Sequence, residues 1–243
     1  MHSIEIKDDK LVKICDSTTI ILQNNYINIE YDFNNGNYSL LIFSDCSSDI
    51  CINEIGTVNN SSVNINYILL DRNNLKQNTK IDVNKDSGLN VNTIYLGINK
   101  KDIKFDLFNK ESDSNVEITN NIVCLQNSDF SLDCIGTIEK GAKRSKCHQK
   151  SHCLTMESPD KARILPVLNI DENDVEASHS LSSGTIDDEI MFYMNSRGLN
   201  SKEALKLILE SYLMPNDDYY RPYINGEYIK EIANKKVEDI CLI

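Results

Sequence analysis

The stretch Tyr26-Ile-Asn-Ile-Glu-Tyr-Asp-Phe33 alternates apolar and polar residues at every step. The same alternation returns at Val63–Tyr67, Ile103–Leu107 and Val116–Ile118, with β-branched and aromatic residues in the apolar positions. A period of two places the apolar side chains on one face of an extended strand, which predicts half-buried β-strands. No helical pattern of useful length interrupts this regime from about Thr18 to His179, so the first three quarters of the chain is predicted to be all β.

A sandwich, a barrel and a parallel β-helix all fit many short strands of this kind. The strands are separated by clusters rich in Asn, Asp, Ser and Gly, such as Asn34–Asn37 and Lys85–Gly88. Asn tolerates the left-handed backbone conformation that the corners of a stacked solenoid need, so these clusters favour a β-helix without deciding for it. Repeats of about 20–25 residues, an ordinary length for solenoids, would give roughly seven rungs over residues 18–180.

The pattern becomes helical after Ser183. The stretch Thr185–Arg197 begins with a hydroxyl residue and three acidic residues and ends with a basic residue before Gly198, which is typical of a helix. Asn200 can cap a second helix, with Glu203 at the capping-box position. A third stretch, 227–240, places apolar residues on one helical face. We therefore divide the chain into a lead-in (1–17), a β core (18–181) and a small helical domain (182–243), whose helices either close the open end of the β core or dock a partner.

The chain has 243 residues, with 37 Asp and Glu against 25 Lys and Arg, and a formal net charge of −12. This acidic balance argues against non-specific nucleic-acid binding, which depends on Lys and Arg neutralising phosphates. No run of about 18 apolar residues predicts a membrane span, and the first residues do not resemble a secretion signal, so we expect a cytoplasmic location.

Eight cysteines in a reducing compartment are expected to be core residues, metal ligands or reactive thiols rather than disulfides. Two of them flank two histidines in the polar segment that runs from Lys140 to Cys153. On an extended strand Cys147 and Cys153 share one face, whereas His148 and His152 share the opposite face. A structural zinc site that uses all four residues is therefore disfavoured, and the basic residues of the segment are interpreted as a solvated face.

His179 is the other candidate, because we place it at the end of the last strand, where a surface or an interface is expected. A neutral imidazole can ligate soft metals or relay protons near pH 7, although a partly buried histidine bonded to the backbone is the plainer interpretation. No phosphate-binding glycine loop, GxSxG or HExxH motif occurs in the sequence, which argues against a self-contained hydrolase or nucleotide-binding enzyme.

Three segments carry a family signature: Lys140–His148, Leu165–Val175 and Ser178–Leu199, the last of which contains Phe-Tyr followed by Ser-Arg-Gly. Together they resemble the core of the SufB/SufD family, most strongly over residues 138–213. The resemblance implies a right-handed parallel β-helix followed by a helical domain. It also implies a non-enzymatic scaffold of the SUF iron–sulfur assembly machinery, whose helices dock the ATPase SufC.

The resemblance also implies site residues. In the family, SufB carries a reactive Cys near the end of the β-helix and a Glu beside a strand-end His, and SufD contributes a His to the heterodimer interface. Here Ser151 stands at the cysteine position and Ser180 at the Glu position, whereas His179 matches the His. The chain therefore looks SufD-like and shortened at its N-terminus. A SufB-like subunit or a second copy of the chain is the expected partner, joined through the open edge of the solenoid.

Two hypotheses follow for the residues. In the first, His179, Cys153, Cys147, His152 and His148 are candidates to contact a transient iron–sulfur cluster, and the basic neighbours Lys146 and Lys150 favour the thiolate of Cys147 or Cys153. Phe192, Tyr193, Arg197 and Gly198 are candidates for SufC binding, although we expect the two aromatic side chains to be buried in the helical domain. In the second, the β-helix is a rigid arm of a SufC complex without cluster chemistry. A polysaccharide-cleaving β-helix is disfavoured, because a secretion signal and a carboxylate cluster are both missing from the sequence.

Overall fold

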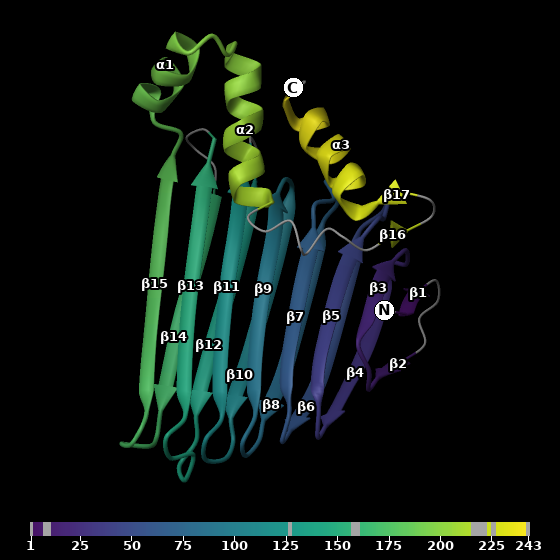
Figure 1. Cartoon of the computed structure of the whole chain (residues 1–243), viewed down its shortest axis with the longest axis vertical. Coiled ribbons are helices and arrows are strands. Elements are labelled where there is room, and N and C mark those ends of the chain that lie inside the picture. Colours follow the sequence, from purple (N-terminus) through teal and green to yellow (C-terminus); the bar gives the residue numbers. More distant parts are fainter. Residues whose placement is uncertain are drawn as a thin grey trace.

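A computed structural model of the chain describes residues 2–6, 11–125, 128–156, 161–214, 223–224 and 227–241. The protein is mainly β: a parallel β-solenoid of about six turns with three helices at its C-terminal end (Figure 1). Of the three architectures that fit the alternation, the solenoid is the one that forms. None of the helices in the described ranges is both long enough and apolar enough to span a membrane.

The solenoid consists of two sheets that share its interior. The eight-stranded sheet contains β1 (His2–Ile6), β3 (Thr18–Leu22), β5 (Asn37–Ser44), β7 (Ser62–Leu69), β9 (Gly88–Gly97), β11 (Asn115–Cys124), β13 (Lys146–Thr155) and β15 (Glu176–Thr185). The seven-stranded sheet contains β2 (Leu11–Ile14), β4 (Tyr26–Asn34), β6 (Ile50–Asn59), β8 (Leu75–Val83), β10 (Lys100–Asn109), β12 (Asp129–Ile138) and β14 (Lys161–Ile170). Neighbouring strands are parallel and two numbers apart, so each turn of the chain adds one strand to each sheet.

One corner of each turn is marked by a residue with positive φ. Asn35, Asn60, Asp86, Asp113 and Arg144 have φ between 45° and 60°, so successive turns are 25, 26, 27 and 31 residues long. Asn and Asp are the side-chain-bearing residues that tolerate this conformation best, which explains the composition of the turn clusters. The turns are longer and fewer than the seven rungs of 20–25 residues that we predicted, because each turn carries two strands of up to ten residues.

The turns are also joined by asparagine side chains that stack in register. Asn60 Nδ2 donates to Asn35 Oδ1 at 2.8 Å, and Asn59 Nδ2 donates to Asn34 Oδ1 at 3.0 Å, in each case across 25 residues of sequence. An amide side chain has both donors and acceptors, so each Asn can bond to the turn on either side of it. Part of the high asparagine content therefore serves the stacking of the solenoid.

The apolar side chains of the alternating pattern point into the interior of the solenoid and form its core. They include the fully buried rings of Tyr31, Phe33, Tyr67, Tyr95 and Phe105. Each such aromatic ring removes a large apolar area from water, which is the main source of stability for a solenoid whose turns have no core of their own.

Glu54 on β6 is the exception inside this core, because it is a carboxylate with 1% exposure. It accepts hydrogen bonds from Tyr67 Oη at 2.9 Å and Gln77 Nε2 at 3.2 Å, and further ones from the hydroxyls of Tyr31 and Thr79. Burial raises the pKa of Glu54 above its usual value of 4.5, and the four hydrogen bonds oppose that shift.

The helices begin near the residues that the sequence indicates. Helix α1 (Asp188–Ser196) is capped by Asp187 rather than by Thr185, and α2 (Ser201–Leu213) has the predicted capping box of Asn200 and Glu203. A two-stranded ribbon, β16 (Tyr223–Ile224) and β17 (Glu227–Tyr228), precedes α3 (Ile229–Cys241). The lead-in predicted for residues 1–17 contains two strands, β1 and β2, which pair with β3 and β4 of the solenoid. The last strand, β15, continues to Thr185, beyond the boundary predicted at residue 181.

Helices α2 and α3 cover the outer flank of the eight-stranded sheet near the ends of its strands (Figure 1). Their buried side chains, which are Leu209, Leu213, Ile229, Ala233 and Val237, pack on outward apolar residues of the sheet, among them Phe43, Ile68, Ile94, Val123 and Leu154. The helices therefore lie along the side of the solenoid, and they do not close its open end at β14 and β15.

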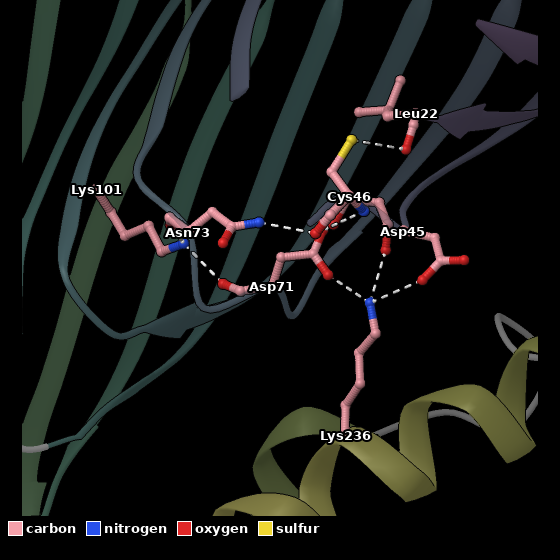
Figure 2. A network of polar contacts seen from close by, with 8 residues as sticks. Leu22, Asp45, Cys46, Asp71, Asn73, Lys101 and Lys236 are labelled. Atoms are coloured by element: carbon pink, nitrogen blue, oxygen red, sulfur yellow. Dashed lines mark hydrogen bonds and ion pairs between the residues drawn. The ribbon is translucent and has the colours of Figure 1, made fainter. Parts of the chain in front are cut away.

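A polar clasp fixes α3 to the solenoid (Figure 2). Lys236 of α3 reaches the ends of two strands, where its Nζ donates to the Ser44 carbonyl at 3.0 Å and lies 3.6 Å from Asp45 Oδ1. It also forms an ion pair with Asp71, whose carboxylate accepts the backbone N–H of Cys46 at 3.2 Å. Asp71 is 8% exposed, so its charge depends on these partners rather than on water.

A second lysine lies on the solenoid side of the clasp. Lys101, on β10, is 3% exposed, and its Nζ donates to the Asp71 carbonyl at 2.8 Å and to the Asn73 carbonyl. Burial lowers the pKa of Lys101 to about 8. Burial, with the charges of Asp71 and Asp45 beside it, raises the pKa of the Cys46 thiol to about 11. The clasp thus binds residue 236 to the turn corners near residues 45 and 71.

Replacing the clasp lysine tests this contact. Lys236→Met keeps the length of the side chain but leaves the buried Asp71 without its cation, so we expect the free energy of unfolding to fall by about 2 kcal/mol. Urea denaturation of the two proteins measures the change. Lys76→Met, at a lysine on the outer face of β8 with no acidic partner among the described residues, is the matched control and should change stability by less than about 0.5 kcal/mol. An equal effect of the two substitutions would contradict the role of the clasp.

Glu54 predicts a pH dependence of stability. Its pKa in the folded protein is raised above the unfolded value of 4.5, so its contribution is most favourable below pH 4.5 and is lost as the pH rises through the folded pKa. We expect the stability of the natural protein relative to Glu54→Gln to decrease across that window, by about 1.4 kcal/mol per unit of pKa difference. Denaturation of both proteins between pH 4 and 8 measures this, and parallel stability curves would contradict the raised pKa.

Candidate functional site

The candidate residues gather in the last turn of the solenoid, on β13 and β15. Cys147 and Cys153 are buried and face the interior, whereas His148 and His152 lie on the outer face of the same strand. The predicted separation of thiols from imidazoles is therefore confirmed. Among the described residues, no group of three or more His, Cys, Asp or Glu side chains converges to hold a metal ion.

Serine hydroxyls orient the two outer histidines. His148 Nδ1 lies 2.7 Å from Ser178 Oγ, and His152 Nδ1 lies 2.8 Å from Ser182 Oγ, in both cases across the β13–β15 pairing. An open hollow of about 250 Å³ lies beside His148, lined also by Glu117, Thr119 and Lys150. The thickness of the sheet separates these groups from the interior thiols, so they do not form one site with them.

The interior thiols differ in their acidity. Burial raises the pKa of Cys147 to about 12, and burial together with the neighbouring Cys147 raises that of Cys134 to about 12. The expectation that Lys146 and Lys150 favour the Cys147 thiolate is therefore wrong. Both lysines extend from the outer face of β13, where Lys146 pairs with Glu176 at 3.1 Å, and the dry interior disfavours the charged thiolate.

Cys153 is the exception among these thiols. A hydrogen bond with the side chain of Cys124, on the adjacent strand β11, lowers the pKa of Cys153 and outweighs the opposing effect of burial. Gly97 stands beside Cys124 on the next strand, and a Cβ atom there would lie 2.9 Å from the Cys124 sulfur, so the glycine leaves room for the thiol pair. The sequence analysis missed Cys124, because only the register of β11 against β13 brings the two cysteines together.

His179 lies in the first half of β15 and not at the end of the strand, which corrects the predicted position. Its register partner on β13 is Gln149, an inward residue, so His179 belongs to the inward row of the last strand. It is exposed nevertheless, because in the described part of the chain no strand pairs with the outer edge of β15. His179 and Cys153 therefore belong to the same interior face at the open end of the solenoid, four register positions apart.

The open end is partly apolar as well as unpaired. Leu165 and Ile170 of β14 are 42% and 45% exposed, and Leu181 of β15 is 45% exposed. The edges of β14 and β15 also present backbone N–H and C=O groups that no described strand satisfies. Such an edge is a template for pairing with another chain.

Helix α1 stands beyond the tip of β15 and buries none of its residues (Figure 1). Phe192 is 76% exposed and Tyr193 is 56% exposed, so the expectation that they pack inside the helical domain is wrong. The guanidinium of Arg197 lies 5.1 Å from the centre of the Tyr193 ring, and Gly198 ends the helix with a φ of 95° and open space around it. The four candidate partner-binding residues are thus all exposed on or next to α1, and together we call them the α1 surface.

Comparison with known proteins identifies the family of the chain. Residues 39–212, more than half of the chain, match the family model described as "SUF system FeS cluster assembly, SufBD core domain". The chain is 37% identical over 81 residues to the iron–sulfur cluster assembly protein SufD of Bacillus subtilis, which covers 33% of this chain and 18% of that protein. It is 43% identical over 47 residues to the corresponding SufD of Escherichia coli, covering 19% of this chain and 11% of that protein.

The segments aligned with these curated relatives span less than a fifth of the relatives' length. A SufBD family iron–sulfur cluster assembly protein of Pyrococcus horikoshii is similar to the same extent, with 31% identity over 80 residues. The match to the core-domain model covers most of the solenoid and the first two helices. The chain therefore belongs to the SufB/SufD family of SUF-system iron–sulfur cluster assembly proteins.

Proposed function

We propose that the chain is a non-enzymatic scaffold subunit of the SUF machinery, which binds the SufC ATPase and takes part in cluster assembly at the open end of its solenoid. The observation that carries the proposal is the position of His179, which is exposed on the interior face of β15, the last strand of the eight-stranded sheet, on the same face as Cys153. An imidazole and an acidified thiol are ligands that suit iron and iron–sulfur clusters. The cluster is cargo, held only while it is assembled.

The α1 surface supports the SufC part of the proposal. Phe192 and Tyr193 are exposed to water in the chain alone. Burying each aromatic side chain against a partner would contribute about 1.5–3 kcal/mol to the free energy of binding. An aromatic pair with an adjacent Arg has the composition of a protein-binding hot spot. Asp188 and Glu189 give the N-terminal end of α1 a negative charge, whereas Arg197 lies at its C-terminal end. We assign this surface to SufC because the family's ATPase is the partner expected at the helical domain.

The open end supports the pairing of two scaffold subunits. Edge groups of β14 and β15 and the exposed Leu165, Ile170 and Leu181 would be covered if a second solenoid continued either sheet. That partner is a SufB-like subunit or a second copy of this chain. In either case the interface would enclose His179, and a movement driven by SufC would expose it to iron and sulfide. We expect the assembly to work in the cytoplasm.

A second function, a rigid arm of a SufC complex without cluster ligation, is favoured by a different observation. Ser151 replaces the cysteine that the family resemblance places at that position, and it is buried with its hydroxyl accepting Asn120 Nδ2 at 3.1 Å. Ser180 replaces the Glu and faces outward beside Lys150. On this alternative the open end is only a structural interface, and ligation belongs to the partner.

Disruption of the α1 surface tests the SufC contact. Phe192→Ala combined with Tyr193→Ala should weaken the complex with SufC by at least about a hundredfold, because two hot-spot aromatics each contribute about 2 kcal/mol or more. Co-purification and size-exclusion chromatography under anaerobic conditions measure the loss. Tyr26→Ala is the matched control, since Tyr26 is 59% exposed and lies on β4, several turns of the solenoid away from β15 and the α1 surface. Binding that survives the double substitution would place SufC elsewhere.

Replacement of His179 separates the two functions. If His179 is a ligand, His179→Ala should reduce by at least about tenfold the charge-transfer absorption obtained on anaerobic reconstitution with iron and sulfide, the effect of losing roughly 1.4 kcal/mol or more of ligation. His152→Ala, on the outer face of the neighbouring strand, should have no effect. Equal absorption in all three proteins would show that the cluster is held without His179, whereas the absence of absorption from the chain on its own would favour the rigid arm.

A further inference from the structure

Gln149 has a buried oxygen atom without a hydrogen-bond partner. The residue lies on β13, faces the interior of the last turn and is 2% exposed. Its Nε2 donates to the carbonyl of Val167 on β14 at 3.1 Å, whereas its Oε1, within the described residues, accepts nothing. A buried polar atom left unsatisfied is unfavourable in a folded protein, so such an atom points to a donor that arrives in another state of the molecule.

The orientation of the amide is fixed by its surroundings. Exchanging the Gln149 oxygen and nitrogen would place two acceptors, Oε1 and the Val167 carbonyl, against each other, so the oxygen must remain the free group. Gly136 leaves the space that this arrangement needs, because a Cβ atom there would lie 2.9 Å from Gln149 Nε2 and 2.5 Å from the Cys147 sulfur. The surroundings of Gln149 therefore hold its amide in one orientation, in which Oε1 points away from Val167.

The neighbours of Gln149 limit the choice of donor. Its register partners in the sheet are Ile118 on β11, which has no polar side chain, and His179 on β15, which carries an imidazole N–H. Ser151, two residues along the same strand, is the rival, because its hydroxyl accepts Asn120 Nδ2 and still has a proton to donate. His179 is exposed at the open end, whereas Ser151 is buried and held by its bond to Asn120.

We propose that Gln149 is a positioning residue for His179: its Oε1 accepts the imidazole N–H once the His179 side chain rotates inward at the open end. The bond fixes which ring nitrogen carries the proton and leaves the lone pair of the other nitrogen directed out of the solenoid. Histidines that ligate metals generally use such an acceptor on the second nitrogen. The ligand role that this orientation serves rests on the function proposed above, but the hydrogen bond itself does not.

The chain is well suited to a direct test, because it contains only four histidines, His2, His148, His152 and His179. With ¹⁵N-labelled histidine, an imidazole N–H that bonds to a buried acceptor exchanges slowly enough with water to be detected by NMR, whereas one exposed to water does not. We expect a protected His179 N–H in the natural chain. Gln149→Met should raise its exchange rate by about tenfold or remove the signal. Gln149→Glu should retain it, because a buried protonated carboxyl still donates to the Val167 carbonyl and keeps an acceptor for the imidazole.

Two controls keep the result interpretable. The carbon-bound ring protons of His148 and His152, whose Nδ1 atoms contact serines on the outer face, do not exchange with water, so their signals should stay constant and report that each variant is folded. Ser151→Ala removes the rival donor and should leave the His179 signal in place. A natural chain without a protected His179 N–H would overturn the proposal, and so would a signal that survives in Gln149→Met or that depends on Ser151 alone.

Cluster reconstitution of the same variants separates this inference from the proposed function. If Gln149→Met frees the His179 N–H but His179→Ala assembles clusters as well as the natural chain does, the contact stands and the ligand role is wrong. If His179→Ala abolishes assembly but the exchange rate of the His179 N–H does not change in Gln149→Met, the ligand role stands and the positioning role is wrong. If both hold, Gln149→Met should reduce the yield of clusters and Gln149→Glu should restore it.

Discussion

The register between parallel strands is the constraint on which the rest of the structure depends. No single turn of the solenoid can bury its own apolar side chains, so each turn is stable only when its strands align residue by residue with those of the next turn. A slip of one residue would send every inward side chain to the surface. The asparagine ladders between successive turns oppose such slips, because Asn59 and Asn60 bond to the equivalent residues one turn earlier.

The candidate site is a product of the same register. Cys124 meets Cys153, and His179 stands beside Gln149, only because strands that are about thirty residues apart in sequence align in this way. The interior of the solenoid then assigns different chemistry to similar groups. It disfavours ionisation of Cys147, whereas a neighbouring thiol favours ionisation of Cys153. At the open end formed by β14 and β15, such interior groups meet solvent without a break in the packing.

Much of this could be predicted from the sequence, and the parts that could not have a common cause. The alternation at Tyr26–Phe33, the capping box of Asn200 and the opposite faces of Cys147 and His148 are local properties, and they were predicted correctly. The length of a turn, the contact of Cys124 with Cys153 and the position of His179 within β15 depend on pairing between distant strands, which local pattern does not encode. Phe192 was assigned to the interior because an apolar helix face looks the same whether its own chain or another protein covers it.

The position of α3 has a consequence for the synthesis of the protein. The apolar row that includes Phe43, Ile68 and Ile94 on the outside of the eight-stranded sheet is complete before the ribosome has made Ile229. Until α3 and its clasp lysine emerge, a nascent solenoid displays this hydrophobic flank and the unpaired edges of its newest strands. The nascent chain is therefore prone to aggregation until α3 is made, and a truncation that removes α3 should make the protein depend on chaperones even though every strand remains.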